Sequence, residues 1–171
     1  IFAGSPNSHK NFEVICEAVS LLEKQVHIGK FKVFITVKGD ENKYAKWLWK
    51  HWGSLKAIDF VGFLPYTELN QLYEESNCLI FPSKVESWGL PISEFAQFGR
   101  PMLLADLPYA HETAVGSLLT AFFDPNNACQ LAEMMKNLIE GDTSILAEIP
   151  IKTIRAPTVN NWGDLFTKLL T

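Results

Sequence analysis

The chain has 171 residues, enough for one ordinary domain with a buried core, so a small scaffold held together by disulfide bonds is excluded. Hydrophobic residues make up 47% and charged residues 20% of it, which excludes a disordered chain, and no apolar run approaches the ~20 residues of a membrane-spanning helix. The net charge of -4 provides no general attraction for nucleic acid, and we expect no such partner, although a local basic patch would not show in this sum.

Short runs of Val, Ile and Phe alternate along the chain with stretches of helical period. These runs are too continuously apolar for half-exposed antiparallel strands and favour buried parallel strands. We expect six strands, at residues 1–3, 32–37, 58–61, 78–81, 102–105 and 121–123. We expect helices between them at residues 11–25, 43–52, 67–75, 91–98 and 109–115, then one after the turn at 124–127 and a last one near 161–170.

The first predicted helix shows why a layered fold is expected. Its apolar residues Phe12, Ile15, Val19 and Leu22 recur at three- and four-residue steps, so one face packs on a sheet. Strands that alternate with such helices predict an α/β fold, with a doubly wound, mainly parallel, Rossmann-like sheet of about six strands and helices on both faces. Ligands bind such sheets at the carboxyl ends of the strands. The loops to consider are therefore residues 4–10, 38–42, 62–66, 82–90 and 106–110.

The three cysteines, Cys16, Cys78 and Cys129, are odd in number, widely spaced and set among apolar neighbours. We expect buried thiols in a reducing compartment, and therefore a cytoplasmic protein. No C-x-x-C or H-x-x-x-H spacing occurs, so no metal site is expected. The sequence opens on IFAG without an initiator Met or a signal peptide, and we expect residues 1–171 to form a single domain of a longer protein.

Residues 85–94, VESWGLPISE, follow the fourth predicted strand and lead into a helix. Pro91 suits the first position of that helix, because the N–H that proline lacks would have no partner there. Gly89 permits a close approach of the backbone just before the helix. Free N–H groups and the positive end of the helix dipole favour a phosphate at this point. Glu94 is expected in the first turn and Glu86 in the loop, with seven residues between the two carboxylates.

Two glutamates separated by seven residues, with G-L-P between them, resemble the signature of the retaining nucleotide-sugar glycosyltransferases. The similarity is to the C-terminal, nucleotide-sugar-binding domain of the two-domain GT-B fold, in the group 1 or family 4-like enzymes. The order and spacing of further segments make this resemblance specific over almost the whole chain. These segments are HKN (9–11), FVGFLPYTELNQLYEESNCLIFPS (60–83), GRP (99–101), DLPYAHE (106–112), FFDPNN (122–127) and NWGDLF (161–166).

The resemblance implies roles for the residues of this signature. Glu94 would accept hydrogen bonds from two ribose hydroxyls of the donor, since an ionised carboxylate binds two neighbouring donors at once. Glu86 would face the transferred sugar and take part in catalysis. A short stretch of backbone would meet the sugar or the diphosphate, which requires little side-chain bulk. This stretch consists of Ser87, Trp88, Gly89 and Leu90.

The resemblance also implies a phosphate-binding role for the loop after the first strand. Lys10 would neutralise the charge that develops on the leaving diphosphate, in place of a metal ion. The family commonly has an arginine after the first glycine of this loop, whereas here Ser5 follows Gly4. Diphosphate binding then depends on Lys10 and on helix and loop amides, with His9 and Lys84 as further candidates.

The function implied by the resemblance is transfer of a hexose-type sugar from a nucleoside diphosphate donor to an acceptor, with retention, in polysaccharide or glycolipid synthesis. The backbone of Phe63 and Leu64 would pair with the edge of the base. A missing N-terminal domain would bind the acceptor, a saccharide or a lipid-linked sugar, so the chain alone would bind donor and transfer nothing. No metal and no cofactor are expected.

Two other functions compete with a transferase. The Ser5 departure fits a non-catalytic nucleotide-sugar-binding or scaffold module that keeps the fold but has lost transfer. An oxidoreductase on the same architecture lacks support, because IFAGSPNSHK contains no G-x-G-x-x-G after the first strand.

The run KWLWKHW at residues 46–52 combines aromatic and basic residues, as do membrane-surface and nucleic-acid-binding faces. A stripe of Tyr44, Trp47, Leu48 and Trp52 at helical spacing favours packing on the sheet instead. Trp49 is then the aromatic residue expected to be most exposed. An exposed Trp49 would favour peripheral association with the cytoplasmic face of a membrane.

Overall fold

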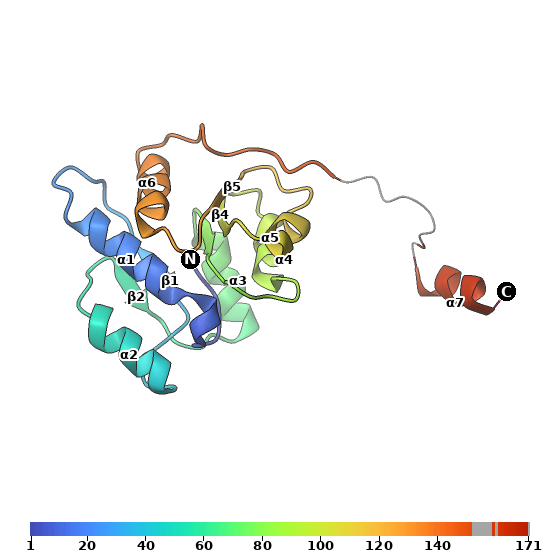
Figure 1. Ribbon diagram of the computed structural model, residues 1–171, viewed down its shortest axis with the longest axis horizontal. Coiled ribbons are helices and arrows are strands. Elements are labelled where there is room, and N and C mark those ends of the chain that lie inside the picture. Colours follow the sequence, from blue (N-terminus) through green and yellow to red (C-terminus); the bar gives the residue numbers. More distant parts are fainter. Residues whose placement is uncertain (152–158, 160, 171) are drawn as a thin grey trace.

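The computed structural model describes residues 1–151, 159 and 161–170 (Figure 1). The helices, in chain order, are the 3-10 helix η1 (Ser8–Lys10), α1 (Phe12–Glu23), α2 (Lys43–Trp52), α3 (Tyr66–Glu75), α4 (Leu90–Ala96), α5 (Pro108–Thr113), α6 (Ala128–Ile139) and α7 (Trp162–Leu170). The strands are β1 (Val33–Ile35), β2 (Ile58–Phe60), β3 (Leu79–Phe81), β4 (Met102–Ala105) and β5 (Thr120–Phe123). All predicted helices and strands are present except the strand at residues 1–3, where an isolated β-bridge is found instead. The 3-10 helix η1 was not expected.

The five strands form two parallel ladders, β1 with β2 and β3 with β4 and β5, which residues 1–3 join. The Phe2 N–H donates to the Phe34 carbonyl at 2.9 Å, and the Ile80 N–H donates to the Ile1 carbonyl at 2.9 Å. Residues 1–3 therefore lie between β1 and β3 and make the sheet continuous. The predicted α/β fold with a mainly parallel, doubly wound sheet is confirmed.

The order across the sheet is β2, β1, residues 1–3, β3, β4 and β5. From residues 1–3 the chain adds β1 and then β2 on one side. It then returns and adds β3, β4 and β5 on the other side. The order reverses between residues 1–3 and β3, and at such a reversal the two following loops leave a crevice at the carboxyl ends of the strands. These loops carry Lys10 and Glu86.

Helices pack on both sides of the sheet. α1 and α6 lie side by side, as do α4 and α5, and β4 and β5 lie between the two pairs (Figure 1). The predicted stripe of α1 is confirmed, because Phe12, Ile15, Val19 and Leu22 are all fully buried. Among the described residues, no helix has both the length and the apolar composition needed to cross a membrane.

The cysteine prediction is correct for Cys16 but wrong for Cys129. Cys16 is buried, Cys78 is half-buried and Cys129 is exposed, and all three are free thiols. Burial raises the pKa of Cys16 to about 12 and that of Cys78 to about 11, so both thiols are protonated near neutral pH. Cys129 lies in the first turn of α6 and is not among the buried residues of that helix, which are Leu131, Ala132, Met134 and Met135.

The packing of α2 also differs from the prediction at one residue. Leu48 is fully buried and Tyr44 and Trp52 are half-buried, but Trp47 is 40% exposed. Because successive residues of an α-helix are turned by about 100°, Trp47 lies beside the buried stripe rather than on it. Trp49 is 49% exposed, as expected.

Candidate functional site

Lys10 and Glu86 meet at the carboxyl end of the sheet, where the strand order reverses. The Lys10 Nζ donates to Glu86 Oε1 at 2.5 Å, and the two side chains are only 16% and 13% exposed. The structure thus brings together the two predicted catalytic residues, which lie 76 positions apart in the chain.

Main-chain contacts join the loops that carry this pair. The Lys84 N–H donates to the His9 carbonyl at 2.7 Å, and the Ser83 hydroxyl donates to the same carbonyl at 3.2 Å. The backbone therefore sets the separation of the two loops, and the ion pair does not depend on two long side chains finding each other. His9 contributes its carbonyl to this contact, while its side chain is exposed.

Asn11 holds a third loop to the same place. Its side chain is 1% exposed, and Nδ2 donates to the carbonyl of Pro82 at 3.1 Å and to that of Pro125 at 2.7 Å. Its φ of 58° lies in the left-handed region, which asparagine tolerates better than most residues. Sequence reasoning gave Asn11 no role, although an asparagine just before a helix is a signal for such a conformation.

Tyr109, from α5, also contacts the loop that carries Glu86. Its hydroxyl donates to the Ser83 carbonyl at 2.6 Å. Burial raises the pKa of Tyr109 well above its usual value, and the nearby Glu86 carboxylate raises it further. The phenol therefore stays protonated and remains a hydrogen-bond donor. Sequence reasoning missed this residue.

Gly89 forms the turn between the Glu86 loop and α4. Its φ of 89° is left-handed, and a Cβ at this position would lie 3.2 Å from Ile92 Cδ1. The helix begins at Leu90, so the predictions that Pro91 comes first and that Glu94 lies in the first turn are wrong by one residue. The left-handed glycine allows the helix to begin one residue before the proline.

The predicted donor-binding stretch lies mostly on the surface. Trp88 is 48% and Leu90 65% exposed, and Ser87 is exposed as well. The Trp88 indole N–H donates to the Ser93 hydroxyl at 3.0 Å, and the Trp88 carbonyl accepts from the Thr113 hydroxyl. Among the hydrogen bonds between described residues, none has a backbone N–H of residues 85–90 as its donor. The backbone N–H groups of this stretch are therefore not taken up by hydrogen bonds to other described residues.

Glu94 lies on α4 and is half-buried beside Tyr73 of α3. Burial raises the pKa of Tyr73 above its usual range, and the charge of the Glu94 carboxylate raises it further. The Tyr73 hydroxyl is buried without a hydrogen-bond partner among the described residues. A protonated phenol thus stands close to the carboxylate predicted to bind ribose.

Gly4 and Ser5 begin the loop that ends at Lys10. The Gly4 N–H donates to the Thr36 hydroxyl at 2.8 Å, and a Cβ on Gly4 would lie 3.1 Å from the ring of Phe2. Ser5 is exposed, and its hydroxyl accepts from the Asn7 side chain at 2.9 Å. A larger side chain at Gly4 would therefore crowd the Phe2 ring, whereas Ser5 adds no charge.

Phe63 and Leu64 lie in the loop after β2, the edge strand of the sheet. Phe63 is 87% exposed and Leu64 is half-buried. β1 and residues 1–3 lie between β2 and β3, so these residues lie farther along the sheet edge than Lys10 and Glu86.

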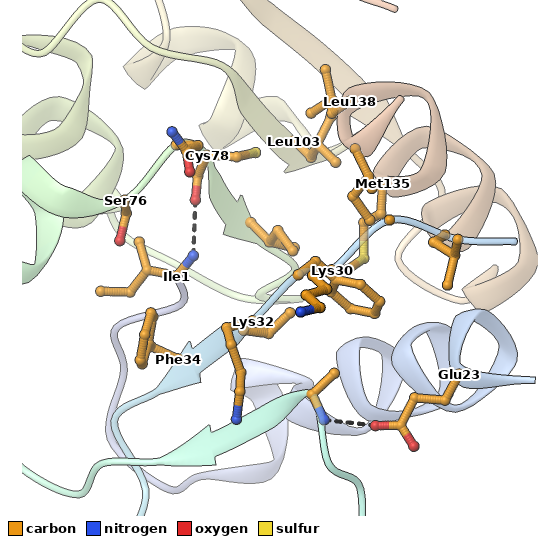
Figure 2. A pocket seen from close by; sticks show the side chains of 18 of the residues that line it. Ile1, Glu23, Lys30, Lys32, Phe34, Ser76, Cys78, Leu103, Met135 and Leu138 are labelled. Carbon is orange, nitrogen blue, oxygen red and sulfur yellow. Dashed lines mark hydrogen bonds between the residues drawn. The ribbon is translucent and has the colours of Figure 1, made fainter. Parts of the chain in front are cut away.

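A hollow of about 950 Å³ lies at the opposite end of the sheet (Figure 2). The Ile1 amino group on its wall donates to the Cys78 carbonyl at 2.8 Å, and Lys32 pairs with Asp59 at 2.7 Å. This hollow opens at the amino ends of the strands, whereas ligands of doubly wound sheets bind at the carboxyl ends. We therefore assign the site to the end that carries Lys10 and Glu86.

No group of three His, Cys, Asp or Glu side chains suited to a metal ion occurs in the described part of the chain.

Residues 1–155 match the family described as "Glycosyl transferases group 1". Among curated proteins, the chain is similar to O-antigen chain mannosyltransferase B of Escherichia coli, with 23% identity over 144 residues that cover 84% of this chain and 37% of that protein. It is also similar to O-antigen chain mannosyltransferase RfbU of Salmonella typhimurium, with 26% identity over 47% of this chain and 22% of that protein. The chain thus spans well under half the length of these relatives.

Solved structures share the fold. Sucrose-phosphate synthase of Thermosynechococcus elongatus matches with a TM-score of 0.68 at 16% identity, over 99% of this chain and 45% of that one. HepE of Anabaena, solved in complex with UDP and glucose, matches with a TM-score of 0.67 at 20% identity, over 84% of this chain and 40% of that one. At these identities the likeness shows the fold alone.

Proposed function

This chain belongs to the group 1 glycosyltransferases, and on that premise we propose that it is the nucleotide-sugar-binding domain of a two-domain, retaining hexosyltransferase. The observation that carries the proposal is the Lys10–Glu86 pair at the reversal of strand order, with Glu86 in the loop whose backbone N–H groups at residues 85–90 have no partner among the described residues. UDP and glucose in the HepE structure support a nucleoside diphosphate sugar as donor. The names of the two O-antigen chain mannosyltransferases support a role in polysaccharide synthesis.

The proposed chemistry begins with the diphosphate. When the bond between the sugar and the diphosphate breaks, negative charge grows on the leaving group, and an ammonium already held in the crevice stabilises it without reorganising. Lys10 supplies this ammonium, so the proposal requires no metal ion. Glu86 holds Lys10 in place before the donor binds, and turns to the hydroxyls of the sugar when the phosphate takes over the ammonium.

The nucleoside lies on the other side of the diphosphate in this proposal. Glu94 accepts two hydrogen bonds from the ribose hydroxyls, and the backbone of Phe63 and Leu64 pairs with the base. The amides of residues 85–90 donate to the diphosphate or to the sugar. An N-terminal domain outside this chain supplies the acceptor, a saccharide or a lipid-linked sugar. The free thiols are in keeping with a cytoplasmic protein.

Isothermal titration of the chain with UDP and with GDP tests the proposal and identifies the base. One of the two nucleotides is expected to bind, and Glu94→Gln to weaken binding at least tenfold, since each hydrogen bond to a charged group contributes about 1.5–3 kcal/mol. Glu133→Gln is the matched control, because Glu133 is an exposed glutamate of α6. If neither nucleotide binds, or if both variants bind as the unchanged chain does, the proposal is wrong.

Ser5 motivates a second candidate, a nucleotide-sugar-binding or scaffold module without transfer activity. Among the described residues, Asn7 is the only hydrogen-bond partner of the Ser5 hydroxyl. Ser5 also adds no positive charge for a diphosphate. Hydrolysis of UDP-sugars and GDP-sugars by the full-length protein separates the candidates. An active Ser5→Arg variant beside an inactive unchanged protein would favour the scaffold, whereas hydrolysis by the unchanged protein favours the enzyme.

A further inference from the structure

Helix α2 carries an exposed face that the proposed transfer reaction does not use. We define the α2 outer face by its exposed basic and indole side chains, Lys43, Lys46, Trp47, Trp49 and Lys50. The helix is anchored beneath this face by Ala45 and Leu48, which are fully buried. The face therefore belongs to a packed helix and does not result from local unfolding.

The positions on the helix separate the lysines from the tryptophans. With a turn of about 100° per residue, Lys46 and Lys50 point almost directly away from the buried Leu48. Trp47 and Trp49 lie on the two flanks, about a quarter turn from Leu48 on either side. The outer face is thus a basic ridge with an indole along each border.

The ridge is positively charged in a chain whose net charge is -4. α2 contains no acidic residue, and none of its three lysines makes an ion pair with a described residue. The acids just before the helix are engaged elsewhere. Glu41 accepts from the backbone N–H groups of Lys38 and Gly39 at 2.6 and 2.9 Å, and Asp40 lies 3.8 Å from the Lys38 ammonium. The ridge therefore complements an anionic surface.

The two indoles are placed as membrane-interface tryptophans are, with part of each ring packed and part exposed. Trp47 packs against Trp52 with ring centres 5.1 Å apart, and Trp49 against Phe60 at 5.0 Å, both edge to face. Neither indole N–H donates to another described residue, so both remain available to lipid carbonyls or phosphates.

These ring contacts argue against single-stranded nucleic acid as the partner. Bases bind such proteins by stacking on open aromatic faces. Trp47 is already stacked on Tyr44, with ring centres 5.9 Å apart and planes 22° apart, and His51 lies 4.8 Å away. Trp47 therefore has little open face left for a base.

We propose that the α2 outer face docks on an anionic lipid bilayer without inserting a helix through it. The Asn42 side chain, which caps α2, also donates to the Pro6 carbonyl at 2.7 Å in the loop that ends at Lys10. Docking through α2 places that loop close to the lipid surface. The proposal does not depend on the proposed function, because it concerns lipid binding and not donor binding.

Flotation of the chain with vesicles of equal parts phosphatidylglycerol and phosphatidylcholine tests the proposal. The chain is expected to float with these vesicles and not with phosphatidylcholine alone. Lys46→Gln/Lys50→Gln is expected to weaken binding roughly 25-fold, since each lysine near an anionic surface contributes about a factor of five. The matched control is Lys24→Gln/Lys30→Gln, which removes the same charge from exposed lysines elsewhere.

A second measurement follows the indoles themselves. Brominated phosphatidylcholine in the anionic vesicles is expected to quench part of the tryptophan fluorescence, and Trp47→Phe/Trp49→Phe to abolish that quenched part. Equal flotation of the two lysine variants, equal binding to neutral vesicles, or quenching that persists in the tryptophan variant would each overturn the proposal. So would tighter binding to a mixed-sequence single-stranded oligonucleotide than to the anionic vesicles.

Discussion

The two ends of the parallel sheet differ in what holds them together. At the carboxyl end, the nearly buried Lys10–Glu86 pair is surrounded by loops that hydrogen bonds tie to one another. At the amino end, a hollow of about 950 Å³ is lined largely by apolar side chains, and the Lys32–Asp59 pair at its edge is about half exposed. This hollow thus lies at the end that we do not assign to function.

This difference shows that the volume of a hollow is by itself a poor guide to the site assigned from charges and loop contacts. At the carboxyl end several residues adopt conformations or positions that cost free energy. They include the left-handed Asn11 and Gly89 and the nearly buried ion pair. The amino end also has left-handed residues, Gly99 and Gly116, but its Lys32–Asp59 pair is about half exposed. Because the more buried of these two ion pairs lies at the carboxyl end, substitutions at the two ends should differ in a predictable order.

The largest difference is expected for a lysine removed from each end. Lys10→Met should weaken nucleoside diphosphate binding roughly a hundredfold, about 3 kcal/mol, because it removes the ammonium proposed to bind phosphate. Lys30→Met, at the rim of the amino-end hollow, should leave binding unchanged. Isothermal titration measures both. Equal effects of the two variants would remove the distinction between the ends.

The next effect concerns the hydrogen bonds that tie the loops. Asn11→Ala should lower the free energy of unfolding by roughly 2 kcal/mol, since it leaves two buried carbonyls, of Pro82 and Pro125, without their donor. Urea unfolding followed by circular dichroism measures the change. Asn11→Gly is the control, because it loses the same bonds but tolerates the left-handed φ. A fully stable Asn11→Gly would show that conformation, not hydrogen bonding, is what Asn11 provides.

A smaller loss is expected from the turn before α4. Gly89→Ala should cost about 1.5 kcal/mol, because alanine at a φ of 89° is strained and its Cβ would crowd Ile92. Gly141→Ala shares the positive φ of 86° but has no atom within 4 Å of the added Cβ. Thermal unfolding of both variants separates strain from crowding. If Gly141→Ala lowers stability more than Gly89→Ala does, an added Cβ at Gly89 does not crowd Ile92.

The smallest effect is expected at the amino end. Lys32→Ala breaks the Lys32–Asp59 pair, but the two side chains are 51% and 41% exposed, so the loss should stay under about 0.5 kcal/mol. Urea unfolding at low and high salt measures it. A loss as large as that of Asn11→Ala would mean that the amino end is braced as firmly as the carboxyl end.

Much of this molecule could be predicted from local patterns. The apolar spacing of Phe12, Ile15, Val19 and Leu22 predicted the buried face of α1, and the bounds of α2 were predicted correctly. The placement of Lys10 and Glu86 at one edge followed from their positions after strands of a parallel sheet. The donor-binding roles of Glu94, Phe63 and Leu64 stay predictions until nucleotide binding is measured.

Other features could not be predicted because they depend on contacts between distant segments. Nothing in the local sequence shows that Tyr109 would reach the Ser83 carbonyl, or that Tyr73 would stand beside Glu94. Composition and spacing predicted that Trp47 and Cys129 would be buried, but each lies on the exposed side of its helix.

The sequence by itself determined the order of the elements, the parallel α/β sheet and the two residues that meet at its carboxyl end. These follow from periodicity and from the rule that parallel strands expose their carboxyl ends together. Only the tertiary structure decided that Lys10 and Glu86 form a nearly buried pair and that Asn11 ties three loops. It also decided that α2 leaves a basic face in solvent. Those outcomes depend on how segments far apart in the chain pack, which no local pattern specifies.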